Sequence, residues 1–311
     1  MAGINPRVDI AFKKLFGVEE NKDLLISLIN AIVSDEDQVV NVKLLNPYNP
    51  KSFQTDKLSI LDIKAEGETG KRYNIEIQIT DESDYDKRAL YYWAKLYTEQ
   101  LKESDRYDKL SKSIGIHILN FTSVPELKPY HNTFHITDKD TGLHAFTDLE
   151  LHTIELTKFS DQAPKTLQEL VTKIKSKLDL WVAFLTRYDI LSDQDLPKEI
   201  DNPPLKKALS TLNIMNFDEE EREAYENHLK WLRIEASTLH KRFEDGKSEG
   251  REEGIEIGEA RGREEEKLLS EKKLKEEKLK MATLMLEKGI DIQTISEVSG
   301  LSLRELSALK S

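Results

Sequence analysis

Residues 57–66 read KLSILDIKAE and residues 71–80 read KRYNIEIQIT, with the segment GETG at 67–70 between them. Isoleucine recurs in both runs, and the segment between them carries glycines of the kind that tight turns require. The side chains of a strand alternate between its two faces. In the second run one face is therefore apolar, and the other consists of Asn74, Glu76 and Gln78. The stretch predicts a β-hairpin that rests on a core and carries polar groups on its other side.

The turn determines which residues of the two strands face each other. If it is centred on Thr69, Asp62 lies opposite Glu76 and the two Cβ atoms are about 5 Å apart. A slip of one residue would move Asp62 to the opposite face. Two carboxylates that close repel each other unless a cation compensates them, and Mg²⁺ prefers oxygen ligands of this kind. Gln78 points the same way and can hold a water or a phosphate oxygen, although its amide cannot act as a cation or a base.

The pattern Asp62, Glu76 and Gln78 suits metal-assisted hydrolysis of a phosphodiester. A bound cation polarises a phosphoryl oxygen, neutralises developing charge and lowers the pKa of a coordinated water. Asp62 and Glu76 would hold the metal. The spacing alone is equally compatible with an exposed strand face of ordinary polar residues.

A long helix is predicted after the hairpin, over residues 84–104. Arg88 and Tyr92 are four residues apart and share one face of it, so that Arg88 can clamp a phosphate. The alternative is an amphipathic helix in which the aromatic run YYW (91–93) packs in the core while Arg88 is solvated.

The remaining sequence up to about residue 215 completes one mixed α+β domain. The first 33 residues have helical periodicity, residues 39–45 read as a short strand, and strand-like runs return at 113–121, 130–136 and 151–156. Residues 164–188 are predicted to form one amphipathic helix with Pro164 near its start.

The composition changes in residues 216–288, where charged residues dominate and glycine falls at every fourth position from 246 to 262. In a helix these glycines would trace a slowly winding groove that lets a second backbone approach, although each costs about 1 kcal/mol relative to alanine. Two interpretations stay open. One is a weakly stable charged helix or linker, and the other is close helix pairing between protomers, which would make the protein a homo-oligomer.

The last segment, 289–311, is predicted to form two short helices around Ser299-Gly300-Leu301. Ser302 is a candidate N-cap with Glu305 three residues on, as in a capping box. The spacing resembles a helix-turn-helix, but the second helix carries few basic residues. DNA contact and a role in protein contact or capping therefore both stay open.

The composition excludes several classes of protein. The chain has 311 residues, a formal charge of −12 and no cysteine, which excludes disulfide scaffolds, cysteine-zinc sites and thiol catalysis and argues against a general binder of polyanions. No apolar run approaches the ~18 residues of a membrane helix, and no signal-peptide core follows Met1. A cytoplasmic protein without membrane association is expected. The seven histidines show no metal-ligand spacing, and His117 is interpreted as a core or edge histidine.

Four runs also resemble a known family, the Rpn recombination-promoting nucleases and transposases of the PD-(D/E)XK nuclease superfamily. The resemblance covers about residues 4–125. The runs are INPRVDIAFKKLFG (4–17), LSILDIKAEGETGKRYNIEIQIT (58–80), KRALYYWAKLYTEQL (87–101) and SKSIGIHILNF (111–121). The charged tail and the terminal segment resemble the C-terminal region of the same family.

The resemblance implies an αβββαβ core, a restriction-endonuclease-like mixed sheet flanked by helices, and Mg²⁺-dependent cleavage of DNA, with Mn²⁺ as a substitute. Asp62 matches the metal-binding aspartate and Glu76 the acid of the (D/E)-x-K motif, while Gln78 replaces the lysine, as is usual in this family. Asp9 matches the D-x-x-F-K start, where an acid completes the metal site or caps the helix. Arg88 and Tyr92 match the helix after the hairpin. The rival hypothesis is a catalytically weak or inactive nuclease fold that binds DNA or protein and assembles through its tail.

Overall fold

The computed structural model describes residues 4–48, 62–80, 84–160, 164–192 and 196–309. The chain divides into two compact units, Met1–Arg233 and Ile234–Ser311. The predicted strand residues 57–61 lie outside the described residues. Among the helices described, none is long and apolar enough to cross a membrane.

Within the described residues, a six-stranded mixed sheet forms the centre of the first unit, in the order β1-β2-β3-β4-β6-β5. Its strands are β1 (Val42–Leu44), β2 (Asp62–Gly67), β3 (Arg72–Gln78), β4 (Ser113–Leu119), β5 (His131–Ile136) and β6 (Phe146–Glu155). β3 runs parallel to β4 and β4 to β6, whereas the pairs β1/β2, β2/β3 and β5/β6 are antiparallel. The chain order of α1, β1–β3, α3 and β4 agrees with the expected αβββαβ core.

The hairpin has the predicted register. Asp62 is paired with Glu76, and Lys64 with Asn74. Gly70 makes the turn possible because its φ of 81° lies in the left-handed region, which residues with a Cβ rarely adopt. Its N–H donates to the carbonyl of Gly67 at 3.0 Å.

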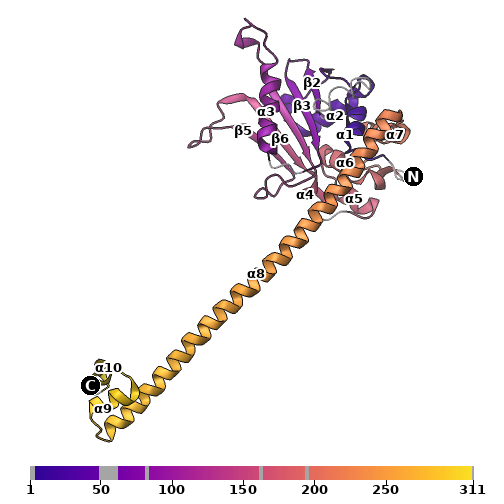
Figure 1. Ribbon diagram of the computed structural model, residues 1–311. Coiled ribbons are helices and arrows are strands. Elements are labelled where there is room, and N and C mark those ends of the chain that lie inside the picture. Colours follow the sequence, from indigo (N-terminus) through magenta and orange to yellow (C-terminus); the bar gives the residue numbers. More distant parts are fainter. Residues whose placement is uncertain (1–3, 49–61, 81–83, 161–163, 193–195, 310–311) are drawn as a thin grey trace. The chain divides into compact units, whose positions relative to one another are not determined.

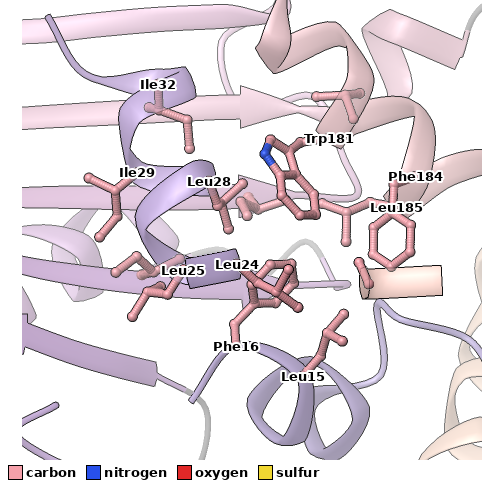
Figure 2. Packing of buried hydrophobic residues seen from close by; sticks show 14 of the residues in the cluster. Leu15, Phe16, Leu24, Leu25, Leu28, Ile29, Ile32, Trp181, Phe184 and Leu185 are labelled. Atoms are coloured by element: carbon pink, nitrogen blue, oxygen red, sulfur yellow. The ribbon is translucent and has the colours of Figure 1, made fainter. Parts of the chain in front are cut away.

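Among the described elements, the helices that cover one face of the sheet include α1 (Asp9–Phe16), α2 (Lys22–Ile32), α6 (Lys177–Ser192) and α7 (Pro203–Ile214). Figure 2 shows the apolar side of α2 turned toward Trp181 and Phe184 of α6. The rings of Phe16 and Trp181 meet edge to face, with their centroids 5.4 Å apart. Full burial of each large apolar side chain is worth about 1.5–3 kcal/mol, so this layer holds α1 firmly against the sheet.

The helix α3 (Tyr85–Thr98) lies over the opposite face (Figure 1). Its Tyr85 and Ala89 form a small cluster with Leu119 and Phe121. The indole N–H of Trp93 donates to the carbonyl of Ser113 at 2.7 Å. The polar side chains of the hairpin therefore lie in the layer between β3 and α3.

The prediction of one continuous helix over residues 164–188 is wrong. It consists of α5 (Leu167–Lys173) and α6, because Ile174 is extended and a new helix start follows at once. The Ser176 hydroxyl accepts from the Asp179 N–H at 3.0 Å, and the Asp179 carboxylate accepts from the Ser176 N–H at 2.8 Å. This reciprocal pair is a capping box.

Other boundaries also differ from the predictions. The first helical region is interrupted by the 3₁₀ turn η1 (Glu19–Asn21), α3 ends at Thr98 rather than at residue 104, and β6 begins at Phe146 rather than at 151. The other short elements of this unit are η2 (Asp35–Asp37), η4 (Tyr107–Lys109) and α4 (Leu156–Ser160).

The charged segment is helical. The helix α8 (Glu219–Glu287) begins in the first unit and continues into the second. The second unit ends in α9 (Ile292–Ser299) and α10 (Leu303–Ala308), which pack through Ile295, Leu301 and Leu306. The predicted capping box of Ser302 and Glu305 is confirmed.

Candidate functional site

Two carboxylates of the hairpin lie side by side on the face covered by α3. Asp62 is the first residue of β2, and its direct cross-strand partner is Glu76 of β3. Ile75 and Ile77 belong to the main core on the other face, so Glu76 points away from that core. It is only 3% exposed. We call Asp62 and Glu76 the acid pair.

Glu76 is surrounded by nitrogen groups of the neighbouring elements. The Arg88 Nη2 of α3 lies 3.4 Å from its Oε1, and the His117 Nδ1 of β4 lies 3.7 Å from its Oε2. Burial lowers the pKa of His117 to about 4, and the Arg88 charge adds to this effect. His117 is therefore neutral at physiological pH, and its place in the core of β4 confirms the sequence interpretation.

Asp62 is held from β1 and its following loop. The Asn46 side-chain amide donates to the Asp62 backbone carbonyl at 3.1 Å and to Oδ1 at 3.4 Å. Burial raises the pKa of Asp62, and the positive charges of Lys64 and Lys13 oppose this rise. The carboxylate is thus poorly solvated and weakly hydrogen-bonded, which is unfavourable for a bare anion.

Asp9 brings a third acid toward the same place from the first turn of α1. Its side chain is 15% exposed, and its Oδ2 lies 3.6 Å from Nδ1 of His228 in α8. Burial and, to a smaller extent, the charge of Glu76 raise the pKa of Asp9 to about 7, although the charge of Arg88 opposes the rise. The charges of Asp9 and Glu76 therefore interact.

Gln78 lies on the face of the acid pair and is 6% exposed. Its Nε2 donates to the carbonyl of Thr80 at 3.1 Å. Its Oε1 is buried and has no hydrogen-bond partner among the described residues. A buried carbonyl oxygen without a partner is costly in a folded protein, so this atom marks a place where a water, a cation or a ligand donor fits.

The helix α3 presents Arg88 and Tyr92 to the acid pair. Burial raises the pKa of Tyr92, and the charges of Glu76 and Asp62 contribute. The alternative arrangement, with YYW in the core and Arg88 in solvent, is wrong. Tyr91 is 63% exposed, and the Arg88 side chain is 22% exposed and faces Glu76. All six residues singled out by sequence therefore gather around one end of the hairpin.

The oxygen donors of the site are compatible with a hard divalent cation. Within the described residues, no three His, Asp or Glu side chains converge closely enough to form a complete protein cage. Mg²⁺ commonly takes only one or two carboxylates and keeps waters or substrate phosphates as its other ligands. The acid pair and the unsatisfied Oε1 of Gln78 meet that requirement.

Sequence reasoning missed three residues of this region, namely Lys13, Asn46 and His228. None lies at a recognisable spacing from the hairpin, since Asn46 and His228 approach it only through tertiary folding. Lys13 lies one helical turn after Asp9 and is a rare buried lysine, 7% exposed. Lys13 is the lysine of the D-x-x-F-K start, but its burial becomes visible only once α1 is placed on the sheet.

A second group of buried acids lies on the opposite face of the sheet, where Glu150 of β6 pairs with the core residue Ile114. Glu150 accepts from Lys112 at 2.8 Å, His135 at 2.9 Å and His152 at 2.7 Å. Asp37 accepts from Lys112 at 2.6 Å and from Lys71 at 2.8 Å. We call these residues the Glu150 cluster; its members are Asp37, Lys71, Lys112, His135, Glu150 and His152.

Two models of known protein families match the chain. A family model described as PD-(D/E)XK nuclease family transposase matches residues 6–242. A second, described as the C-terminal HTH domain of the Rpn/YhgA-like nuclease family, matches residues 275–311. Neither a curated protein nor a solved structure matches the chain. The first match contains the whole region around the acid pair, and the second contains α9 and α10.

Proposed function

The chain belongs to the PD-(D/E)XK nuclease family of transposases and carries the C-terminal HTH domain of the Rpn/YhgA-like nucleases, and we propose that it is a Mg²⁺-dependent DNA endonuclease. The observation that carries the proposal is the direct pairing of Asp62 with Glu76 on one face of the sheet. Membership of the family supports nuclease chemistry in general. The metal, its ligands and the DNA substrate are part of the proposal.

In this proposal Asp62 and Glu76 hold the cation, and Mn²⁺ can replace Mg²⁺. When bound, the ion supplies Lewis acidity toward a phosphoryl oxygen and a coordinated water of lowered pKa. Burial makes the charged form of Asp62 unfavourable and raises its pKa. A bound cation would offset this cost, which supports the role of the acid pair as metal ligands.

The other side chains orient the reactants. Gln78 is proposed to hold the attacking water, which can donate to its Oε1, an atom with unmet acceptor capacity within the described residues. The alternative is that the second N–H of its side-chain amide donates to a phosphate oxygen. Arg88 is proposed to bind the scissile or adjacent phosphate, because a guanidinium pairs well with phosphate oxygens. Asp9 is proposed to complete the acidic surroundings from α1, and Tyr92 lines the approach from α3.

We propose that the C-terminal HTH domain provides a DNA contact in addition to that of the cleavage site. Because the chain carries a net charge of −12, we expect weak binding that falls steeply with added salt, as for any interface that relies on a few phosphate contacts. Tight binding without metal at physiological salt would contradict this expectation.

The experiment is a plasmid-nicking assay with wild-type protein and the Asp62→Asn variant, in Mg²⁺, Mn²⁺ or EDTA. Wild type is expected to nick in either metal and not in EDTA, and Asp62→Asn is expected to be inactive. Glu66→Gln is the matched control, because Glu66 lies on the same strand face but pairs with Arg72 at 3.1 Å. Equal nicking by wild type and Asp62→Asn would refute the catalytic assignment.

A second function, assembly through the tail, is favoured by one observation. In α8 the glycines from 246 to 262 have open space around them, since a Cβ at each would meet nothing within 4 Å. We propose that a second protomer approaches there. Sedimentation of the full chain and of a chain ending at Arg233 tests this. The same oligomeric state in both would contradict it.

A further inference from the structure

A row of polar side chains crosses the sheet on the face that α3 covers. Asp62 of β2 pairs with Glu76 of β3, and Glu76 pairs with His117 of β4. The row continues to Thr153 of β6, which pairs with His117. Glu76 therefore lies between Asp62 on one side and His117 on the other. Because the proposed cation is shared by Asp62 and Glu76, His117 lies on the side of Glu76 that is remote from it.

His117 approaches Glu76 without a hydrogen bond to it. Its Nδ1 lies 3.7 Å from Oε2 of Glu76, and this nitrogen is enclosed and has no hydrogen-bond partner among the described residues. The whole residue is only 2% exposed. A buried polar atom that lacks a partner costs about 1–3 kcal/mol. The fold therefore carries a cost at this atom that an apolar side chain on the same strand would avoid.

The imidazole ring of His117 is fixed by its neighbours. The ring of Tyr85 in α3 meets it edge to face, with the centroids 5.7 Å apart. Gly115, two residues earlier in β4, leaves room for the ring, since a Cβ at this position would lie 3.1 Å from Nε2 of His117. Packing by an aromatic ring and the space above a glycine thus hold the imidazole with its Nδ1 toward Glu76.

The two carboxylate oxygens of Glu76 have different surroundings. Oε1 lies 3.4 Å from Nη2 of Arg88, whose side chain is 22% exposed, whereas Oε2 faces the enclosed ring of His117. Oε1 is therefore the oxygen that an arriving cation reaches more easily. An imidazole can present an N–H at Nδ1 in its neutral or its charged form. The terminal torsion of a glutamate is soft, so a small rotation of the carboxylate brings Oε2 within hydrogen-bond distance of Nδ1.

We propose that His117 is a positioning residue of the metal site: its Nδ1–H donates to Oε2 of Glu76 and leaves Oε1 for the cation that Glu76 shares with Asp62. The inference rests on the proposed function and deepens it, because it names the group that orients a metal ligand. Removal of such a partner of a metal ligand typically weakens metal binding about 10- to 100-fold. In this arrangement His117 touches neither the cation nor the DNA.

The test compares three substitutions of His117 in the full chain. His117→Phe keeps a ring against Tyr85 but removes the donor, and His117→Leu removes both. His117→Asn keeps an N–H donor near the position of Nδ1. The matched control is His152→Phe, because His152 of β6 is also 2% exposed and bonds a buried glutamate, Glu150, at 2.7 Å on the opposite face of the sheet.

The first readout is the affinity for Mn²⁺ without DNA, followed by the electron paramagnetic resonance signal of the free ion. Binding that persists in Asp62→Asn measures the background from other acidic groups of the chain. His117→Phe and His117→Leu are expected to weaken the affinity about tenfold or more, and His117→Asn to stay within about threefold of wild type. His152→Phe is expected to keep the affinity of wild type.

The second readout is thermal unfolding in EDTA, which measures the structural role alone. His117→Phe is expected to match or exceed wild type, because it removes a buried polar atom that has no partner among the described residues. His152→Phe is expected to unfold at a lower temperature, because it breaks the hydrogen bond to Glu150. A positioning residue and a structural residue therefore give opposite results in the two measurements.

The outcomes distinguish this inference from the proposed function. Wild type that nicks DNA, with unchanged Mn²⁺ affinity in His117→Phe or His117→Leu, overturns the inference and leaves the nuclease assignment intact; if one of these variants does not fold, the other decides. Wild type that binds Mn²⁺ without nicking DNA refutes the nuclease assignment, and weaker binding in His117→Phe with recovery in His117→Asn then still supports the positioning role. Equal loss of affinity in His117→Asn or in His152→Phe overturns the inference, as does wild type that binds no more Mn²⁺ than Asp62→Asn.

Discussion

The acid pair and the Glu150 cluster lie on opposite faces of one sheet, and they differ in how their negative charge is met. Although burial alone would raise the pKa of Glu150, hydrogen bonds from His152, Lys112 and His135 hold it far below its usual range. Burial raises the pKa of Asp62, and the nearby lysine charges do not reverse this rise. The charge of Glu150 is met by three nitrogen donors of the fold, whereas in the acid pair Glu76 has Arg88 beside it and the charge of Asp62 is met only in part.

The difference in how the carboxylates are paired distinguishes acids that stabilise the fold from acids that can bind a cation. A compensated cluster fixes neighbouring elements, here η2 and the strands β4 and β6, and gains nothing from an added cation. An uncompensated one lowers stability until a cation binds, and perturbed carboxylates of this kind are typical of functional sites. The fold tolerates this cost beside α3 because the apolar core on the other face supplies the stability.

The largest expected effect is the loss of activity when the acid pair is broken. Glu76→Gln is expected to reduce Mg²⁺-dependent nicking by about 10³-fold or more, since the electrostatic contribution of a metal ligand is at least that of an oxyanion-hole donor. Its unfolding midpoint in EDTA is expected to equal or exceed that of wild type. If Glu76→Gln lost activity only in proportion to the loss of folded protein, Glu76 would have a structural role like that of Glu150.

In the Glu150 cluster we expect a substitution to lower stability and to leave the activity of the folded protein unchanged. Glu150→Gln leaves Lys112 with one carboxylate fewer and is expected to destabilise the protein by about 3 kcal/mol, the usual cost of removing one partner of a buried pair. Nicking by the remaining folded protein is expected to be unchanged. Denaturant unfolding and specific activity measured on the same samples check this, and unchanged stability would contradict it.

The pH dependence of stability differs in sign between Asp9, the acid of α1 whose pKa Glu76 helps to raise, and Glu150. The pKa of Asp9 rises from 3.8 unfolded to about 7 folded, so the folded state keeps a proton that the unfolded state releases. Stability therefore falls as pH rises from about 4 to 7. Asp9→Asn is expected to match wild type at pH 4 and to exceed it by about 2 kcal/mol at pH 8, a discounted value because Asp9 keeps some exposure.

The contribution of Glu150 to stability depends on pH with the opposite sign. Its pKa lies below the ordinary 4.5 in the folded state, so its stabilisation is complete above that pH and is lost as the pH falls below it. Denaturant titrations in EDTA from pH 3 to 8 measure both slopes. A flat profile for the wild type between pH 4 and 7, with no gain in Asp9→Asn at pH 8, would show that the folded state does not raise the pKa of Asp9.

The sequence predicted the acid pair because its signals are local. The alternation of polar and apolar residues in 71–80 and the glycines of GETG fix the register with no help from distant parts of the chain, and the pairing of Asp62 with Glu76 follows. The break at Ile174 was missed, although the sequence Ser176-x-x-Asp179 carried a capping signal, because the amphipathic period continues across it.

The Glu150 cluster and the position of Lys13 could not be predicted in this way. His135 and His152 have no motif spacing, and they meet at Glu150 because β5 returns antiparallel to β6. Lys13 belongs to the D-x-x-F-K start, but the sequence does not show that the packing of α1 buries it to 7% exposure. Such features depend on how separate elements pack together, which composition and periodicity do not record.

The smallest expected effect concerns the partial compensation of Glu76 by Arg88. If the guanidinium competes with the cation for Glu76, Arg88→Gln lowers the Mg²⁺ concentration for half-maximal nicking by about threefold, in line with the 0.2–1 kcal/mol of a partly exposed ion pair. The maximal rate falls as well, because the same residue is proposed to bind phosphate. Nicking rates over a Mg²⁺ titration separate the two effects. A higher Mg²⁺ requirement would mean that Arg88 holds Glu76 in the orientation the metal needs, and the acid pair would then be compensated in part by its own fold, as Glu150 is.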